Sequence, residues 1–310
     1  LASNVSGSSN AAFGTNALAN STAGNNTAIG EGSMYLTTTG GSNSALGWQS
    51  LYNNTTGALN TALGRQALFS NTTASNNTAI GFKALYSNTT GTSLVALGYQ
   101  ALANNTTASS NTAVGFLSLG ATTTGPQNTA VGWGSLFSNT TGSNNVALGY
   151  GGLFLNVTGG NNTAVGFESL RNTTAGNNTA VGYQALYSNT TATNNVAVGY
   201  QALLDNTTVG NLTAIGYQAL TNNTTGTAHT ALGFQALLNN TTGSSNTAIG
   251  RQALASNTAG TANTALGYLS LYSNTTAFYN IAIGYQALFS NTTASSNTAV
   301  GYQALRNTTG

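Results

Sequence analysis

The sequence predicts an all-β fold, a parallel β-solenoid or β-roll of about 18 coils with a 17-residue repeat, built by one chain or by several chains side by side. Two observations support this prediction. A glycine recurs 18 times along the 310 residues, and 15 of the 17 intervals between these glycines are 17 residues long. Short runs rich in Val, Ile, Tyr and Phe flank each glycine and are bounded by Asn, Ser and Gly, which is typical of short strands.

The recurring glycines set the register, and we call them the anchor glycines. Ala stands two positions before each of them, an apolar residue one position before, and Leu or Met four positions after. These apolar columns are five and twelve residues apart, which does not fit one face of a helix. The anchor glycines are Gly14, Gly30, Gly47, Gly64, Gly81, Gly98, Gly115, Gly132, Gly149, Gly166, Gly182, Gly199, Gly216, Gly233, Gly250, Gly267, Gly284 and Gly301.

The unit at 178–194, NTAVGYQALYSNTTATN, shows the expected coil most clearly. We predict two strands in it, Thr179–Val181 before the glycine and Tyr183–Leu186 after it. The Val, Ile or Leu column before the glycine and the Leu column after it are expected to form a dry interior. The invariant Ala column is expected to mark a tight place, such as a contact between chains. Stacked Gln, Asn and aromatic side chains should form ladders along the coils.

Residues 1–310 are expected to form a single continuous repeat array. Leu1 falls in the Leu column of a preceding unit, and the last residues stop within a further unit. We therefore expect a segment of a longer array or a subunit that stacks end to end.

The composition argues against several classes of function. Charged residues make up 3% of the chain and the net charge is +2, so there is no basic surface for nucleic acid. No apolar run is long enough to insert into a membrane, and the lack of Cys excludes disulfides and thiolate chemistry. His229 stands alone, and Glu31, Glu168 and Asp205 are far apart in sequence. We therefore expect no metal site, no cofactor, no paired-carboxylate catalysis and no enzyme.

In most units the corner that follows the Leu carries Asn-x-Thr or Asn-x-Ser, the acceptor of N-linked glycans. Because the chain has so few charges, a row of glycans would supply hydration. The alternative is that Asn and Thr act here only as turn formers and as ladders. A sparser set of acceptors precedes the next strand, at Asn25, Asn76, Asn161, Asn177 and Asn211. The corner candidates are Asn4, Asn20, Asn54, Asn71, Asn88, Asn105, Asn139, Asn156, Asn172, Asn189, Asn206, Asn223, Asn240, Asn274, Asn291 and Asn307.

An aromatic residue follows the anchor glycine in 14 units, and Gln comes next in ten. A surface aromatic ladder is predicted through Tyr183, Tyr200, Tyr217 and Phe234. Together with the Gln column it allows a second interpretation, a solenoid that binds carbohydrate or another surface. Regular Thr ladders allow a third, an ice-binding solenoid. The Thr residues are expected in corners more than on a flat strand face, which disfavours the third interpretation.

The pattern Asn-Thr-Ala-Val/Ile-Gly, followed by two residues, a small residue and a Gly or Ala corner, resembles the head repeats of trimeric autotransporter adhesins. It is similar also to repeats of bacterial and phage tail-fibre proteins that carry an endosialidase-type chaperone domain. The resemblance covers all 18 units and implies left-handed parallel β-rolls, three chains side by side, that work as adhesins or fibres. The units are longer than the adhesin repeat, with the extra residues in the Ser-Asn-Thr-Thr corner, and the sequence contains no stalk, membrane anchor or chaperone domain. Trimerisation is thus implied by likeness alone.

The expected function is a structural fibre or adhesin-like rod, extracellular or on the cell surface, glycosylated at the Asn-Thr-Thr corners. The expected partners are further copies of the chain in a homotrimer or filament, covalent glycans, and host or environmental surfaces. Nucleic-acid binding and membrane insertion are not expected.

Overall fold

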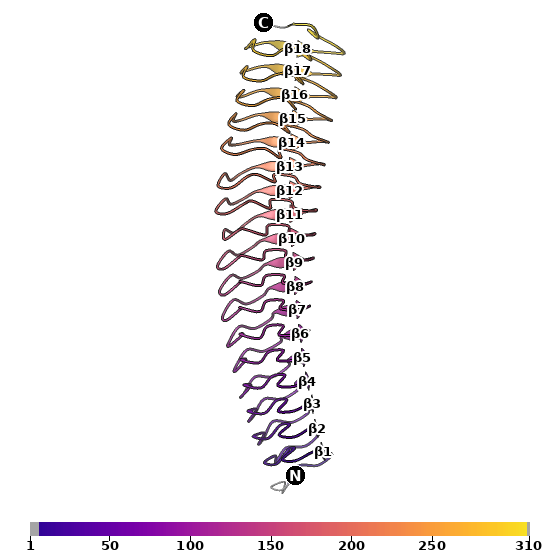
Figure 1. Ribbon diagram of the computed structural model, residues 1–310, viewed down its shortest axis with the longest axis vertical. Helices are drawn as coiled ribbons and strands as arrows, with labels where there is room; N and C mark the ends of the chain where they lie inside the picture. Colours follow the sequence, from indigo (N-terminus) through magenta and orange to yellow (C-terminus); the bar gives the residue numbers. More distant parts are fainter. Residues whose placement is uncertain (1–5, 309–310) are drawn as a thin grey trace. The chain divides into compact units, whose positions relative to one another are not determined.

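The computed structural model describes residues 6–308, and the chain divides into two compact units, 1–160 and 161–310. Within residues 6–308, each unit contains nine parallel strands of three residues, one per coil, and no helix. The predicted all-β solenoid class with its 17-residue repeat is confirmed in both units (Figure 1). Residues 6–308 accordingly hold no helix that is long and apolar enough to cross a membrane.

The strands of the N-terminal unit are β1 (Ala11–Phe13), β2 (Thr27–Ile29), β3 (Ser44–Leu46), β4 (Thr61–Leu63), β5 (Thr78–Ile80), β6 (Val95–Leu97), β7 (Thr112–Val114), β8 (Thr129–Val131) and β9 (Val146–Leu148). Those of the C-terminal unit are β10 (Thr163–Val165), β11 (Thr179–Val181), β12 (Val196–Val198), β13 (Thr213–Ile215), β14 (Thr230–Leu232), β15 (Thr247–Ile249), β16 (Thr264–Leu266), β17 (Ile281–Ile283) and β18 (Thr298–Val300).

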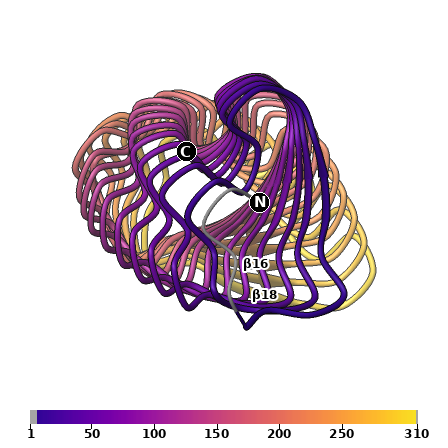
Figure 2. The ribbon, with the colours of Figure 1, turned by 90° about the horizontal axis from the view of Figure 1, so that it is seen from below.

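Within each unit, every strand pairs in parallel with the strand one repeat further along. Equivalent residues stand opposite each other: Ala62 pairs with Ala79, and Ala197 with Ala214. Viewed along the stack, successive coils of the N-terminal unit follow nearly the same outline (Figure 2). Residues of one sequence column therefore lie directly above one another, as the repeat predicts.

The interior of a coil is formed in part by other residues than those expected. The Ala two positions before the glycine is buried almost everywhere, as at Ala180 and Ala197, while the Leu four positions after it, such as Leu186, is fully buried. The Val, Ile or Leu column points outward instead, so its placement in the interior was wrong, and the Ala column lines the interior of the coil. The reason is strand alternation, because an inward Ala places both of its neighbours outside.

The second predicted strand, Tyr183–Leu186, was also wrong. Those residues form turns, and Gln184 and Leu186 have φ of +51° and +53°. Ala185 and Leu186 are adjacent in sequence, yet both side chains are fully buried. An extended strand cannot do this, because it sends adjacent side chains to opposite faces. The left-handed φ at Leu186 turns its side chain into the interior beside Ala185.

Candidate functional site

Two columns of buried asparagines close most of the coils. In the coil anchored by Gly47, Asn43 precedes the strand and Asn54 lies at the corner. The Nδ2 atoms of both donate to the backbone oxygen of Gly57, each at 2.9 Å. Both side chains are fully buried. One carbonyl thus connects the two sides of the coil through side-chain amides, which satisfies polar groups that would otherwise be buried without partners.

The corner asparagines also connect successive coils. Asn71 donates from Nδ2 to Asn54 Oδ1 at 2.9 Å and to the Ala74 oxygen at 3.0 Å. Its own Oδ1 accepts from Asn88 Nδ2 at 3.1 Å. Both Nδ2 hydrogens and the Oδ1 atom of Asn71 are therefore hydrogen-bonded in the interior of the protein.

This burial contradicts glycosylation at most of the predicted corner residues. An N-linked glycan replaces a hydrogen on Nδ2, and in Asn71 both Nδ2 hydrogens lie inside the protein, bonded to the Asn of the previous coil and to a backbone oxygen of the same coil. The ladder and a glycan exclude each other at these positions. The fully buried candidates are Asn54, Asn71, Asn88, Asn105, Asn139, Asn156, Asn189, Asn206, Asn223, Asn240, Asn274 and Asn291.

The remaining corner candidates are placed differently. Asn4 lies outside the described residues. Asn20 is half-buried and donates from Nδ2 to the Tyr35 oxygen at 2.7 Å. Asn172 is half-buried and Asn307 is exposed. Asn20, Asn172 and Asn307 belong to shorter or terminal coils, where the Asn stands one position early and does not enter the ladder.

The sparser acceptor set before the strands is exposed. Its members take φ between 59° and 63°, a conformation that Asn tolerates better than most residues. Asn104 and Asn239 are also exposed acceptors, and their triplets overlap those of the buried residues Asn105 and Asn240. The exposed members of the sparser set are Asn25, Asn76, Asn161, Asn177 and Asn211.

The corner ladder is interrupted where Thr122 replaces Asn. Asn105 Oδ1 and Thr122 Oγ1 are buried and make no hydrogen bond within residues 6–308. The replacement Thr122→Asn is expected to raise the free energy of unfolding by about 1–2 kcal/mol, because it supplies the missing donor to Asn105. Urea unfolding of the two proteins measures the difference. Thr124→Asn, at the exposed side of the same corner, should leave the free energy of unfolding unchanged. An equal gain in stability from both variants would show that the new donor to Asn105 is not the cause.

His229 replaces the Asn that precedes the strand. Its Nδ1 accepts from the Asn246 backbone N–H at 3.3 Å, so Nε2 carries the proton and donates to the Gly243 oxygen at 2.7 Å. The ring thus reproduces the acceptor and the donor of the Asn in other coils. It belongs to the coil closure, and burial lowers its pKa below the ordinary value of 6.5.

The lowered pKa of His229 predicts a pH dependence of stability. As the pH falls below about 6.5, the unfolded chain binds the proton before the folded chain does, so the free energy of unfolding falls until the folded pKa is reached. Each unit by which the pKa is lowered corresponds to about 1.4 kcal/mol. Urea unfolding between pH 7 and pH 5 should show this loss in the native chain and a smaller one in His229→Asn. An equal pH dependence of the free energy of unfolding in both proteins would contradict the prediction.

The outward side of the strands, which we call the strand face, carries two ladders beside the buried Ala column. One ladder holds mainly Thr and the other Val, Ile or Leu, and no charged residue occurs in either between residues 11 and 300. Leu46, Leu63 and Leu97 are 41–48% exposed. The hydroxyls of Thr61 and Thr78 make no hydrogen bond to other residues of the described range. Most Thr residues lie in the corners, as expected, and a further Thr row lies on the strand face.

The predicted aromatic and Gln ladders are both formed. Tyr183, Tyr200, Tyr217 and Phe234 stack with ring centroids 5.0–5.2 Å apart and planes 8° from parallel. Beside them, Gln side chains donate from Nε2 to Oε1 of the previous rung at 3.0–3.4 Å. Each ring covers the face of the next, so edges rather than faces are presented to solvent. This geometry leaves little ring face for stacking of a sugar.

A second aromatic column, five positions after the anchor glycine, was missed. Tyr35, Tyr52, Phe69 and Tyr86 stack at 5.2–5.5 Å. The recurrence of Tyr or Phe at this offset is visible in the sequence, at the position that directly follows the second predicted strand. The two aromatic columns lie on the turn side of the coil, away from the buried Ala.

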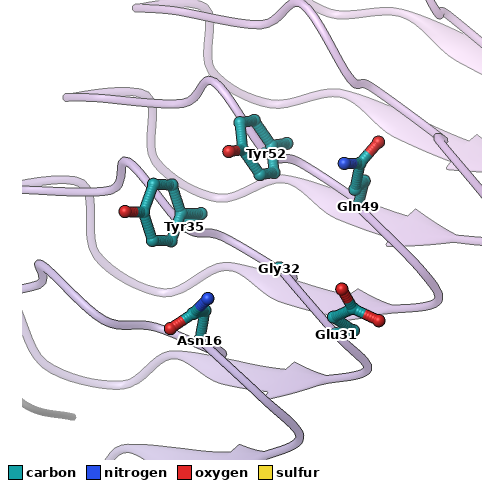
Figure 3. Close-up of a pocket in the computed structure, with 6 residues that line it drawn as sticks. All are labelled: Asn16, Glu31, Gly32, Tyr35, Gln49 and Tyr52. Carbon is teal, nitrogen blue, oxygen red and sulfur yellow. The ribbon is translucent and has the colours of Figure 1, made fainter.

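A cavity of about 160 Å³ lies beside this column, where Glu31 and Gly32 replace the usual aromatic residue and Gln. Figure 3 shows Tyr35 and Tyr52 on one side of Gly32, with Glu31 and Gln49 on the other. A Cβ on Gly32 would lie 3.2 Å from the Tyr52 ring, so the glycine leaves room for that ring. The cavity presents one carboxylate, which does not make a pair for acid–base chemistry.

Ionisable groups are otherwise scattered. Glu168 pairs with Arg171 at 3.3 Å and accepts from Gln184 at 3.0 Å. Among residues 6–308, no three His, Asp or Glu side chains come together in a way that could hold a metal ion. No protein-family model matches the chain, and no curated protein matches it.

Proposed function

We propose that this chain is a structural, self-associating β-solenoid that works outside the cell as part of a fibre or an adhesin-like rod. The observation that carries the proposal is the strand face, where Leu46, Leu63 and Leu97 form an uncharged exposed row. Exposed apolar patches of this kind mark interaction surfaces. The extracellular location and the choice between homotrimer and filament come from the resemblance to adhesin heads and tail fibres.

The occupant of the strand face is a second copy of the chain. Side chains recur on this face at the spacing of parallel strands, about 4.8 Å. A partner keeps contact over many rungs only if its own side chains recur at the same spacing, and another copy does so. The unpaired Thr hydroxyls can then bond across the contact. The absence of charge from both ladders means that like charges do not oppose the association.

The double variant Leu63→Glu and Leu97→Glu is expected to convert an oligomer into a monomer, because association would bury two carboxylates without partners. Sedimentation equilibrium over a range of protein concentrations measures the mass. Thr73→Glu with Thr90→Glu adds the same charge at exposed corner positions and should leave the oligomer intact. A native chain that stays monomeric throughout, or a double variant with the native mass, would contradict the proposal.

We propose glycans, where the chain carries them, on the exposed acceptors such as Asn25, Asn76 and Asn211 rather than in the buried column. The exposure of these residues and their position outside the buried column support this placement. Peptide mapping of native material by mass spectrometry tests it, and a glycan found on Asn71 or Asn88 would contradict it.

Ice binding is a second candidate function, because the flat strand face presents a regular row of unpaired Thr hydroxyls beside apolar side chains. An assay of ice recrystallisation separates the two candidates. Inhibition by the native chain that is lost in Leu63→Glu with Leu97→Glu would favour ice binding. Oligomerisation without inhibition would favour the structural function.

A further inference from the structure

The second aromatic column is interrupted in the N-terminal unit. Its rings stack up to Tyr86 and again from Phe137 to Phe154, where the centroids are 5.2 Å apart. Between them, Ala103 and Gly120 occupy two successive rungs. A cavity of about 240 Å³ lies over these two residues. The column therefore has a gap of two rungs, where two rings are replaced by a methyl group and a hydrogen.

The end of the gap is an aromatic face. A Cβ on Gly120 would lie 3.4 Å from Cδ2 and Cε2 of Phe137, so the Phe137 ring reaches over this glycine. Within residues 6–308, Phe137 stacks on Phe154 only, and its other side has no ring beside it. Rings inside an unbroken run of the column are covered on both sides, as Tyr52 is by Tyr35 and Phe69.

Two unpaired amides stand at the rim of the gap. The Gln ladder is broken at Gln100, because Lys83 precedes it in the column and Leu117 follows it. The side-chain amides of Gln100 and Asn104 line the cavity and make no hydrogen bond with other residues of the described range. No charged side chain lines the cavity. The site therefore offers apolar walls, one ring face and neutral hydrogen-bonding groups.

We propose that this gap, lined by Gln100, Ala103, Asn104, Leu117, Gly120 and Phe137, binds a neutral planar aromatic molecule of the phenol class. Its ring stacks on Phe137 and its hydroxyl bonds to the amide of Gln100 or Asn104. Apolar cavities of about 150 Å³ admit benzene, so 240 Å³ admits a substituted ring. The ligand ring stacks with an offset on Phe137, at about the spacing of the rings in the column, and this stacking orients the ligand. The gap lies on the turn side of the coil and does not depend on association through the strand face.

The test is a titration of the full chain with 4-fluorophenol, followed by the fluorine NMR shift of the ligand. We expect saturation with a Kd on the order of 1 mM, as befits a small ligand. Ala103→Phe rebuilds a ring that Phe69 and Tyr86 carry at the same offset, so this variant should fold and bind at least tenfold more weakly. Leu238→Phe adds a ring at the same offset in the C-terminal unit and should leave the Kd unchanged.

Any of three binding results would overturn the proposal: a shift that does not saturate, equal binding by Ala103→Phe, or equally effective displacement by cyclohexanol. A lower oligomeric mass of Ala103→Phe, with Leu238→Phe unchanged, would also overturn it, since an aromatic side chain of a second copy would then fill the gap. The strand-face variant Leu63→Glu with Leu97→Glu should bind 4-fluorophenol as the native chain does, which keeps this test separate from the proposed function.

Discussion

Replacing Gly233 with Ala is expected to lower the free energy of unfolding by at least about 3 kcal/mol. Gly233 has φ of +135°, a conformation that side chains other than glycine rarely adopt. A Cβ there would lie 2.5 Å from the oxygen and 2.7 Å from the carbon of Gly250. These are backbone atoms of the next rung, where the Gly250 N–H is held by the Leu232 oxygen at 2.8 Å. The clash cannot be relieved without breaking the pairing of the coils.

Urea unfolding of purified protein measures this loss, and Ala262→Gly is the matched control. Ala262 has φ of +57°, so exchange to glycine relieves backbone strain while it adds freedom to the unfolded chain. The two effects oppose each other, so the free energy of unfolding of Ala262→Gly should stay within about 0.5 kcal/mol of the native value. If Gly233→Ala were as stable as Ala262→Gly, the anchor glycines would not stack as described.

The substitution Asn71→Asp is expected to lower the free energy of unfolding by about 3–5 kcal/mol at pH 7. The two side chains have nearly the same shape, but a carboxylate has no hydrogens to donate. Asn54 Oδ1 would lose its donor, the Ala74 oxygen would keep only the hydrogen bond from Asn60 Nδ2, and a charge would be placed at a fully buried position. The loss should shrink at low pH, where the unpaired carboxyl is neutral.

Asn76→Asp is the matched control, five residues away in the same coil. Asn76 is exposed, so the same exchange should cost less than about 0.5 kcal/mol. Thermal and urea unfolding of both variants give the comparison. Equal losses would mean that the corner column is not buried and that its amides do not form the ladder.

The register of this fold was predictable because one glycine per coil cannot be replaced. The positive φ and the close approach of rungs at Gly233 both require glycine, so the spacing of the column is preserved over the chain. The Gln and aromatic ladders followed from the same register, since equal spacing stacks equal side chains. The short Thr-Ala-Val strand was predictable from its β-branched residues and its bounding Gly and Asn.

The orientation of the strand was not predictable from those three residues. Thr179, Ala180 and Val181 alternate, and the pattern fits either Ala inside or its neighbours inside. Hydrophobicity favours Val181 inside, yet Ala180 is the buried residue. A coil of 17 residues has room for little beyond one Leu and small residues, and Leu186 already fills that space. The small size of the interior determines which face of the strand points inward, and that size cannot be inferred from the sequence pattern.

The role of the corner asparagines was missed for a related reason. Asn in a turn-rich corner is typical of an exposed residue, and the acceptor triplet suggested glycans. The narrow coil instead brings Asn43 and Asn54 to one carbonyl, so these polar side chains replace the second strand as the connection across the coil. Such convergence joins residues 11 positions apart and depends on the left-handed turns at Gln49 and Leu51, which no local pattern signals.

Hydrogen exchange of asparagine side-chain amides, followed by NMR on protein labelled with ¹⁵N at Asn, tests the central claim most directly. The buried ladders predict two populations, one exchanging far more slowly than the other. Asn71→Asp should remove a slow pair of signals and Asn76→Asp a fast pair, which assigns them without reference to the fold. Uniformly fast exchange, with no protected side-chain amides at all, would show that the asparagine columns face water and that the coils are not closed in this way.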